Sequence, residues 1–405
     1  MDSLNRPNIE TDGERTTGRK RLILVLNIGS SSLKFGVYRI TFDQVQRLMS
    51  GEAQALGTPA STFNAIDAHQ QPLVGHPMPM LTTEHALHEI ERLLEQLRLG
   101  PLDGIGHRIV HGGPALRQPC VINQQVLEQL QQVTDFAPLH LPLALSVIDE
   151  TIRHFAQVAQ VVCFDTGFHA QMPAVAHVLA LPKQLFRQGI QRYGFHGLSC
   201  ESIVRRFGSR LPERLIIAHL GNGASITAVR AGQSVDTSMG LTPSGGMIMS
   251  TRSGDLDPGV LIYLIRQKGL DAAAVEELVD RQSGLLGISG LSADMRTLKI
   301  ASPTQADARL AIEMFCYSAY KQIAAMIAVL GGIDALVFTG GIGENDAQVR
   351  AQICEGLAWT GLSLDSALNQ LGSDLISTSE SICAVRVFAS QEDEEIARHT
   401  WQLIT

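Results

Sequence analysis

Apolar runs punctuated by glycine-rich turns form the clearest pattern along the chain. Continuous apolar runs typical of buried strands lie at 22–26, 35–40, 105–110, 158–164, 214–218, 226–229, 334–339 and 384–388. Apolar residues at helical spacing predict helices over 82–98, 126–133, 258–269, 305–330 and 393–402. Residues 305–330 are apolar around much of the circumference, which predicts a largely buried helix. Strands alternating with helices over this length predict an α/β fold.

One strand–turn–strand pattern occurs twice. LVLNIGSSSLKFGVY (24–38) and LIIAHLGNGASITAV (215–229) each combine a buried strand, a glycine turn and a second strand. The repetition is weak, but it indicates two related lobes. The length of 405 residues also favours two domains.

Composition restricts the class of partner. The hydrophobic fraction is 45%, which fits a folded globular protein, whereas aromatic residues make up only 5%. The net charge of −8 argues against nucleic acid or an anionic membrane as the main partner. If the substrates are anions, the site that binds them must be locally basic.

The ends and the cysteines indicate a cytoplasmic location. Six cysteines are scattered without a CxxC pair, which fits a reducing compartment. The first 20 residues are polar and lack the apolar segment of a signal peptide, so we expect a disordered extension over 1–20. The longest apolar stretch, 323–338, is interrupted by two glycines and Asp334 and is too short to span a bilayer.

Two arginines and a histidine beside glycines point to phosphoryl transfer. Arg108 lies in GHRIVHGG (106–113), His196 in RYGFHG (192–197) and Arg252 in STRSGDLDP (250–258). Phosphoryl transfer needs positive charge around the equatorial oxygens of the moving group more than covalent help from the protein. Arg108 is inside an apolar strand, where an unpaired cation is costly, so either a carboxylate of the protein or a substrate must meet it.

Three glycine-rich turns could hold a nucleotide. NIGSSSLK (27–34) offers backbone N–H groups, the Asn27 carbonyl oxygen for Mg²⁺ and the Lys34 charge. HLGNGAS (219–225) and GGIGEN (340–345) each follow a buried strand. Each turn also has a structural interpretation: a serine-rich hairpin, a type I′ hairpin turn and a tight connection between strand and helix. None has the Walker A or Rossmann spacing.

Single polar residues can likewise be interpreted as functional or as purely structural. Asp165 ends a strand and could instead be a helix N-cap. His196 could be a hydrogen-bonded core histidine. The remaining histidines considered show no HExxH spacing, so the sequence predicts no zinc site; they are His107, His111, His140, His169 and His219.

Taken together, these segments resemble the acetate kinase family of the actin-like ATPase superfamily. The resemblance runs from about residue 22 to 400 and is carried by NIGSSSLKFGVY, GHRIVHGG, APLHLP, VCFDTGFH, RYGFHGLS, HLGNGASITAV, VDTSMGLTP, TRSGDLDPGV, GLLGISGLSADMR, VFTGGIGEN and EIARHT. It implies two actin-like (ribonuclease H-like) lobes, each with a ββαβαβ core, separated by a nucleotide-binding cleft. The expected boundaries are 21–167 plus 392–405 for one lobe and 168–391 for the nucleotide-binding lobe.

The family resemblance also implies an activity. The expected reaction is reversible in-line transfer of the γ-phosphoryl group of ATP to the carboxylate of acetate, giving acetyl phosphate and ADP. Family members are typically homodimers. The alternatives are a propionate or butyrate kinase of the same family and, from another class, an actin- or chaperone-like nucleotide-dependent binding protein. A sugar kinase fits less well, because a hydroxyl nucleophile needs a carboxylate base.

Residue roles follow from the resemblance by position. Asn27 and Glu392 would hold Mg²⁺ or Mn²⁺, and Lys34 would approach the phosphates. Arg108 would bind the acetate carboxylate and the phosphoryl group, Arg252 and His196 would stabilise the transition state, and Asp165 would be the catalytic acidic residue. The phosphate cradle would comprise His219, Leu220, Gly221, Asn222 and Gly223. The adenosine site would comprise Asp294, Met295, Arg296, Gly341, Ile342, Gly343, Glu344 and Asn345. The apolar substrate pocket would comprise Val110, Leu139, Phe195 and Pro243.

Physical chemistry refines one role. A carboxylic acid substrate resembles a glutamate side chain, with a pKa of about 4.3, and is already ionised at neutral pH. We therefore expect Asp165 to position the carboxylate or the metal and not to abstract a proton. The sequence departs from the family pattern beside these residues, at Leu141, Leu198, Cys200 and Gly245.

Overall fold

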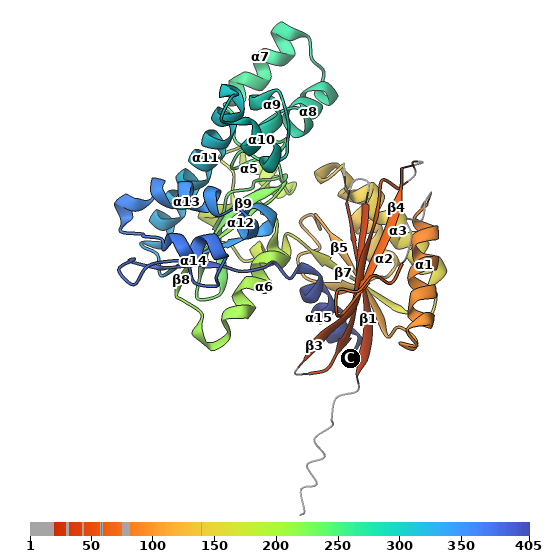
Figure 1. Cartoon of the computed structure of the whole chain (residues 1–405). Helices are drawn as coiled ribbons and strands as arrows, with labels where there is room; N and C mark the ends of the chain where they lie inside the picture. Colours follow the sequence, from red (N-terminus) through yellow and green to blue (C-terminus); the bar gives the residue numbers. More distant parts are fainter. Residues whose placement is uncertain are drawn as a thin grey trace, which may run out of the picture.

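The computed structural model describes residues 20–29, 32–42, 44–56, 58, 60–74, 82–138 and 140–405. The expected disordered extension lies outside the described residues except for Lys20, as do Ser30, Ser31 and Leu139. The described chain forms two β-sheets with helices on both faces of each, which confirms the α/β prediction. Figure 1 shows the two sheets in separate lobes.

The first sheet carries the N-terminal strands. β1 (Arg21–Ile28) is hydrogen-bonded to β2 (Ser32–Ile40) in antiparallel fashion and to β5 (Gly104–Ile109) in parallel. The order across the sheet is β4 (Thr62–Asp67), β3 (Val45–Gln54), β2 (Ser32–Ile40), β1 (Arg21–Ile28), β5 (Gly104–Ile109), β7 (Ala159–Phe164) and β6 (Cys120–Val121).

The second sheet repeats the central part of the first. Its order is β10 (Gln233–Thr237), β9 (Ala224–Arg230), β8 (Arg214–Leu220), β11 (Ala335–Thr339) and β12 (Ala384–Val387). β8 pairs antiparallel with β9 and parallel with β11, just as β1 pairs with β2 and β5. The weak sequence repeat therefore marks two sheets of related topology. Each also has a third antiparallel strand, β3 or β10, that the predicted ββαβαβ core omits.

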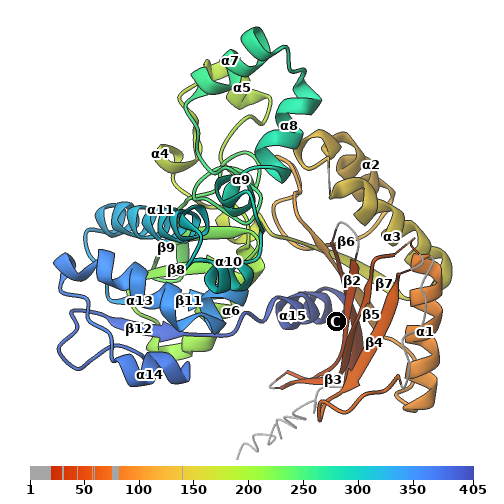
Figure 2. The same cartoon turned by 45° about the horizontal axis from the view of Figure 1, so that its top comes forward.

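Both faces of the first sheet are covered because both sets of alternate side chains on β1 are apolar. Leu22, Leu24 and Leu26 belong to the core that contains α1 (Thr83–Gln96). Ile23 and Val25 belong to a core with Ile396 and Ala397 of the C-terminal helix α15 (Glu392–Ile404). α2 (Gln124–Gln132) and α3 (Leu141–His154) lie on the α1 side. In Figure 2, α15 lies between the two sheets.

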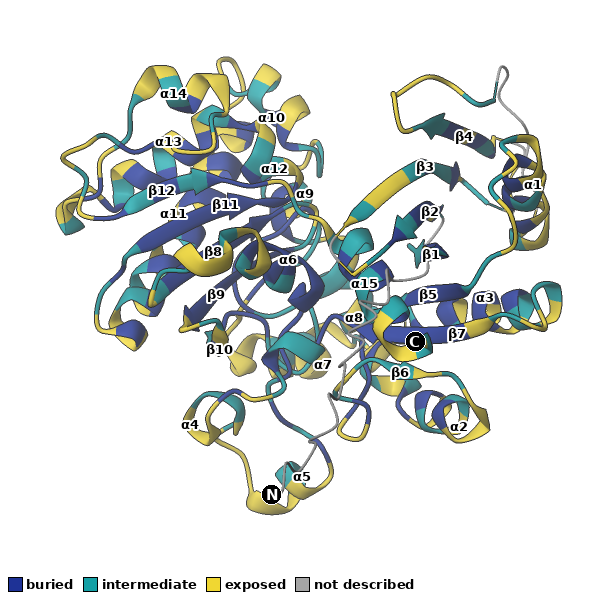
Figure 3. Ribbon diagram, turned by 90° about the horizontal axis from the view of Figure 1, so that it is seen from below, coloured by how far each residue is buried: buried dark blue, intermediate teal, exposed yellow. Residues whose placement is uncertain are grey.

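The second sheet is built in the same way. Ile216, Ala218 and Leu220 of β8 pack in the core formed with the long helix α11 (Ala306–Leu330), whereas Leu215 and Ile217 pack with α6 (Gly197–Phe207) on the other face. Figure 3 shows these central strands as buried. The remaining helices surround this lobe: α4 (Ala174–His177), α5 (Lys183–Arg187), α7 (Pro258–Lys268), α8 (Ala272–Arg281), α9 (Gly284–Ser289), α10 (Met295–Ala301), α12 (Gly340–Asn345), α13 (Ala347–Gly356) and α14 (Ser366–Leu371).

Two local predictions differ from the structure. α11 was predicted to be largely buried, but only nine of its 25 residues are buried, and Met314 and Tyr317 are among its exposed apolar side chains. GGIGEN is not a turn but the short helix α12, which starts directly after β11. Among the described residues, no helix is both long and apolar enough to cross a membrane.

Candidate active site

A cleft of about 1160 Å³ lies between the two lobes. Its walls come from β1, β2 and the start of α15 on one side and from the β8–β9 turn, α10 and α12 on the other. The predicted site residues that line it are Asn27, Lys34, Arg108, His196, His219, Gly221, Asn222, Gly223, Asp294, Met295, Arg296, Gly341, Ile342, Glu344, Asn345 and Glu392. Residues far apart in the sequence therefore share one cavity.

Arg108 is held at the end of β5 by a carboxylate of the protein. Its Nε and Nη2 donate to the two oxygens of Asp165 at 2.9 and 2.7 Å, and Nη1 donates to Asn27 Oδ1 at 3.1 Å. Burial alone would lower the pKa of Arg108, but Asp165 and Glu392 outweigh it and raise this pKa. Burial raises the pKa of the Asp165 carboxyl, and Arg108 opposes that rise. Asp165 is thus an ion-pair partner and not a helix N-cap.

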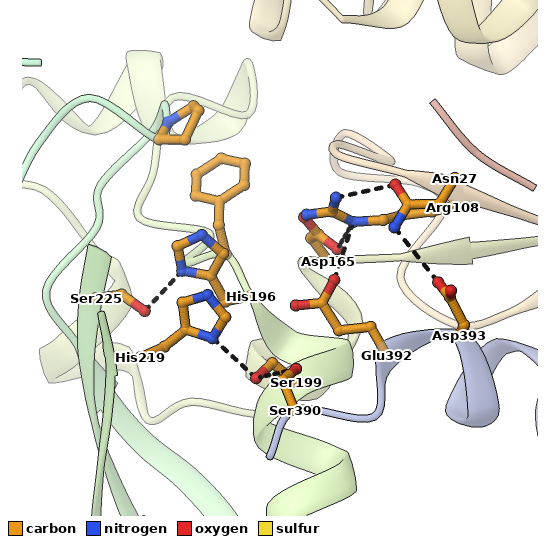
Figure 4. Close-up of polar contacts among 12 residues, drawn as sticks. Asn27, Arg108, Asp165, His196, Ser199, His219, Ser225, Ser390, Glu392 and Asp393 are labelled. Atoms are coloured by element: carbon orange, nitrogen blue, oxygen red, sulfur yellow. Dashed lines mark hydrogen bonds and ion pairs between the residues drawn. The ribbon is translucent and has the colours of Figure 1, made fainter. Parts of the chain in front are cut away.

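Carboxylates gather around this arginine. Glu392 Oε2 lies 3.8 Å from Arg108 Nε, and Asn27 Nδ2 donates to Asp393 Oδ1 at 3.4 Å. Both acids lie in the first turn of α15, where the positive end of the helix dipole favours negative side chains. Figure 4 shows Asn27, Arg108, Asp165, Glu392 and Asp393 as one group.

Two stacked imidazoles face this group from the second lobe (Figure 4). The His196 and His219 rings are 4.2 Å apart and nearly parallel. His196 Nδ1 lies 2.9 Å from Ser225 Oγ, and His219 Nδ1 lies 2.9 Å from Ser199 Oγ. Burial, followed by the charges of His219, Arg108 and Arg252, holds the pKa of His196 well below its usual range. His196 is therefore neutral at pH 7.

The backbone at His196 is in an unusual conformation. Its φ is +59°, in the left-handed region that non-glycine residues rarely adopt. Such conformations persist where the surrounding structure holds them, often at functional sites. Here the conformation precedes α6 and directs the ring toward Ser225 and the β8–β9 turn.

Arg252 lies beside the same turn. Its Nη1 donates to the Pro243 carbonyl at 3.2 Å. A Cβ added to Gly223 would lie 3.1 Å from His196 Nε2 and 3.4 Å from Arg252 Nη1, so both side chains approach this glycine. Burial lowers the pKa of Arg252, Asp280 raises it and Arg108 lowers it further. HLGNGAS is therefore a hairpin turn and a wall of the cleft at once.

The predicted adenosine residues lie at the far wall. Asp294 caps α10 by accepting from the Arg296 backbone N–H, and the Arg296 side chain forms an ion pair with it at 2.6 Å. This contact with Arg296 lowers the pKa of Asp294 to about 2. Glu344 of α12 accepts from the backbone N–H groups of Gly340 and Ser390 at 2.9 Å. These contacts tie α12 to the segment that leads into α15.

The remaining predicted residues lie behind the lining. Phe195 is buried in the core of the second lobe, and Val110 of the first lobe packs against that core. Pro243 contacts Arg252 through its carbonyl, and Leu139 lies outside the described residues. The Leu220 side chain is in the same core and Gly343 is buried, so Leu220 can face the cleft only through its backbone.

Oxygen donors near Arg108 fit a hard divalent cation. Carboxylate and amide oxygens, as on Glu392, Asp393 and Asn27, are the ligands that Mg²⁺ prefers. The Asn27 oxygen accepts from Arg108 in this structure. In the described part of the chain, the groups of three ligand side chains whose atoms lie within 4.8 Å of one another are elsewhere: His88, Glu91 and His154, and Glu201, Glu395 and His399.

Sequence reasoning missed several lining residues. Tyr38 and Arg47 line the cleft beside Lys34, but the strand that carries Arg47, β3, was not predicted. Asp393 was part of a predicted helix, and its position in the acidic first turn was an available signal. Lys299 also lines the cleft, and its ion pair with Asp346 joins α10 to the start of α13. No sequence motif marks Lys299.

The four residues that depart from the family pattern contact other parts of the protein and do not line the cleft. Leu141 begins α3 and is buried, and Leu198 packs in the core shared with α15. Cys200 is buried with Sγ 3.7 Å from Thr227 Oγ1. A Cβ added to Gly245 would lie 3.3 Å from Asp255 Oδ1.

Comparison with known proteins gives one consistent family. The acetokinase family matches residues 22–398. The chain is 42% identical to an acetate kinase of Rhizobium meliloti over 391 residues, covering 95% of this chain and 98% of that protein. A propionate kinase structure from Francisella tularensis subsp. tularensis superposes with a TM-score of 0.89 at 36% identity, over 95% of this chain and 100% of that one. The Porphyromonas gingivalis acetate kinase structure gives a TM-score of 0.84 at 35% identity, over 95% and 100% of the two chains.

Proposed function

The chain belongs to the acetokinase family, and from that membership we propose that it transfers the γ-phosphoryl group of ATP to the carboxylate of acetate. The products are acetyl phosphate and ADP, and the reaction is reversible. The observation that carries the proposal is the cleft itself, which is lined by Arg108 of one lobe and His196 of the other.

The proposed division of labour follows from charge. Both substrates are anions, so catalysis consists of neutralising charge and aligning the two groups in line. Arg108 binds the acetate carboxylate, and Arg108 and Arg252 neutralise the equatorial oxygens of the moving phosphoryl group. Asp165 fixes the Arg108 guanidinium through two hydrogen bonds and takes no proton from acetate, which is ionised at pH 7.

His196 acts as a neutral hydrogen-bond donor. With Nδ1 accepting the Ser225 hydroxyl hydrogen, Nε2 carries the ring hydrogen and faces Gly223. A preorganised donor of this kind stabilises developing charge without solvent reorganisation. Val110, Phe195 and Pro243 would border the methyl group of acetate; Leu139, predicted for the same pocket, lies outside the described residues.

The nucleotide binds mainly to the wall of the cleft that the second lobe forms. Lys34 approaches the phosphates, and the His219–Gly223 turn lies against them. Asp294, Met295, Arg296 and the Gly341–Asn345 helix surround adenosine. Glu392 and Asn27 would hold Mg²⁺ or Mn²⁺, and the cation would neutralise phosphate charge.

Hydroxylamine trapping tests the reaction. The purified protein is incubated with ATP, Mg²⁺ and either acetate, propionate, butyrate or glucose, and hydroxamate is measured. Hydroxamate with acetate supports the proposal. Hydrolysis of ATP at a rate indifferent to acetate would instead support a nucleotide-dependent binding protein, and phosphorylation of glucose would support a sugar kinase.

Propionate is the second candidate substrate, because the Francisella tularensis structure that superposes at a TM-score of 0.89 is a propionate kinase. One methylene changes discrimination by only about 1–3 kcal/mol. Val110 is expected to border the alkyl group of the substrate, and on that expectation we favour acetate. The ratio of kcat/KM for the two acids decides between them.

We also propose a cytoplasmic homodimer. Exposed apolar side chains on α7 and α11, such as Tyr263 and Tyr317, are available for a second copy of the chain. Light scattering coupled to size-exclusion chromatography gives the mass in solution, and a mass of 43.8 kDa, that of a single chain, would contradict the dimer.

A further inference from the structure

Imidazole and carboxylate groups join α1 to α3 away from the cleft. His88 and Glu91 are on α1, and His154 is the last residue of α3. One ligand atom from each lies within 4.8 Å of the others. Figure 1 shows α1 and α3 on the side of the first lobe that faces away from the second. The cluster is therefore separate from the proposed active site.

The three side chains already contact one another. His154 Nε2 lies 3.0 Å from Glu91 Oε2, and the His88 and His154 rings are 4.5 Å apart, edge to face. On α1, Glu84 lies one turn before His88, with 3.9 Å between Oε1 and His88 Nε2. Residues three and four apart share one helix face, so α1 presents Glu84, His88 and Glu91 together.

A second observation concerns Glu150, one turn before His154 on α3. Its Oε2 is buried and has no hydrogen-bond partner among the described residues. A buried carboxylate oxygen without a partner is costly. Burial raises the pKa of Glu150, Arg153 lowers it and Glu84 raises it, so Glu150 and Glu84 are close enough to repel. The two helices thus bring surplus negative charge to the cluster.

We propose that His88, Glu91 and His154 bind a divalent transition-metal cation, with Zn²⁺ as the expected ion. Two imidazole nitrogens and a carboxylate oxygen form a common ligand set for Zn²⁺ and its neighbours in the first transition row. Mg²⁺ is a poor fit because it prefers oxygen ligands throughout. Glu84 and Glu150 are near enough to compensate the charge of the cation.

The geometry needs only side-chain adjustment. Zn–N bonds of about 2.1 Å place tetrahedral ligand atoms about 3.4 Å apart. The ligand atoms of the cluster lie within 4.8 Å of one another. Rotation of the side chains can shorten these distances to about 3.4 Å, because the His88 side chain is 57% exposed and that of Glu91 is 45% exposed. His154 ends α3, where the negative end of the helix dipole favours a cation. The positive charge of Arg153, next to His154, opposes binding of a cation. Its Nε donates to the backbone carbonyl of Asp149, one turn earlier on α3.

The other three-ligand cluster does not have this character. Glu395 is already paired with the guanidinium of Arg205, and Arg205 also lies 3.7 Å from Glu201. A fixed cation in contact with two of the three ligands repels a metal ion. The α1–α3 cluster is therefore the one assigned to metal, where the ion would clamp the two helices that cover the first sheet.

Cobalt spectroscopy tests the site without relying on activity. Tag-free protein, freed of metal with a chelator, is titrated with Co²⁺ in the absence of nucleotide. The visible absorption of Co²⁺ bound to nitrogen and oxygen ligands reports occupancy, and added Zn²⁺ displaces it. We expect one Co²⁺ per chain with the spectrum of nitrogen ligation, which separates this site from the oxygen ligands of Asn27 and Glu392, and we expect His88→Ala and His154→Ala each to weaken its binding at least about tenfold.

Two variants serve as matched controls. His69→Ala removes an exposed histidine outside the cluster, and His399→Ala removes a ligand of the other three-residue group; neither should change Co²⁺ affinity. Circular dichroism checks that the His88→Ala protein is folded, which we expect because the His88 side chain is 57% exposed. Equal affinity in wild type and His88→Ala, loss only in His399→Ala, or no binding at millimolar Co²⁺ would each overturn the proposal.

Discussion

At the scale of single residues, the site is organised by one cationic side chain and its anionic partner. Arg108 donates two N–H groups to Asp165 and a third to Asn27, so its guanidinium has a fixed orientation. Arg252 has a different environment: among the described residues, its guanidinium donates one hydrogen bond, to the Pro243 carbonyl. The first guanidinium is preorganised, whereas the second retains hydrogen-bond capacity for a ligand.

Replacement of Arg252 tests its role. Arg252→Ala should lower kcat roughly 10²–10³-fold, because one donor to the transition state is lost. Binding of ATP should change much less, since Arg252 lies behind the lining of the cleft near Gly223. Steady-state kinetics with acetate and equilibrium binding of ATP measure the two effects. Arg266→Ala, on the exposed face of α7, is the control, and comparable losses in kcat and ATP affinity would contradict the assignment.

Buried histidines predict the pH dependence of stability. Burial lowers the pKa values of His107, His111 and His169 to about 4. The unfolded chain takes up protons near pH 6.5, whereas the folded chain does so only near pH 4, so stability falls as the pH drops between these values. Each histidine accounts for about 2 kcal/mol between pH 7 and 5.

Urea denaturation at pH 7 and pH 5 measures this effect. The midpoint concentration should be lower at pH 5, and His107→Gln should show a smaller difference between the two pH values than wild type. A midpoint that is unchanged or higher at pH 5 would show that the buried histidines do not dominate the response.

At the scale of elements, the β8–β9 hairpin links the fold to the chemistry. Its turn has little room for a side chain at Gly223, because the side chains of His196 and Arg252 both approach this residue. The corresponding β1–β2 hairpin carries Asn27 and Lys34 on the opposite wall. Two hairpins of the same design therefore provide the two sides of the cleft.

Gly223→Ala should disturb the site without unfolding the protein. The added Cβ would lie 3.1 Å from His196 Nε2, so the ring or the turn must move by a few tenths of an ångström or more. A displacement of this kind can cost roughly 10²-fold in rate. We expect a reduced kcat with an unchanged melting temperature. Gly240→Ala is the control, since a Cβ there meets nothing within 4 Å; a wild-type kcat in Gly223→Ala would argue against close packing at this turn.

The same elements show what the sequence could predict. Strands such as β1 and β8 were predictable because both faces are buried and their apolar runs are continuous. β3 was not, since only Met49 and Ala53 among its ten residues are buried. The contact between Arg108 and Asp165 could not be derived, because it depends on the parallel pairing of β5 with β7. The stacking of His196 on His219 depends likewise on how α6 packs against β8.

At the scale of the whole molecule, the helices α15 and α6 contact each other between the lobes. α15 packs on the first sheet and α6 on the second, and the two helices contact each other. Arg205 of α6 forms an ion pair with Glu395 of α15, whose side chain is almost fully buried. His399 of α15 lies 2.9 Å from Glu201 of α6. These contacts fix the relation between the two walls of the cleft.

Removal of the arginine should weaken the connection. Arg205→Ala leaves the Glu395 carboxylate buried without its partner, which typically costs about 3–5 kcal/mol. We expect a lower free energy of unfolding in urea at pH 7. The double variant Arg205→Ala, Glu395→Gln should recover part of the loss, because no uncompensated charge remains; a double variant as unstable as the single one would assign the effect to packing instead.

The position of α15 has a consequence for synthesis on the ribosome. The strand that it covers, β1, is synthesised before the whole second sheet, whereas α15 is synthesised after that sheet. Until α15 has been made, the apolar surface of Ile23 and Val25 stays open to solvent and chaperones, and Glu392 is absent from the cleft. The first lobe can therefore be completed only after the strands of the second lobe have left the ribosome.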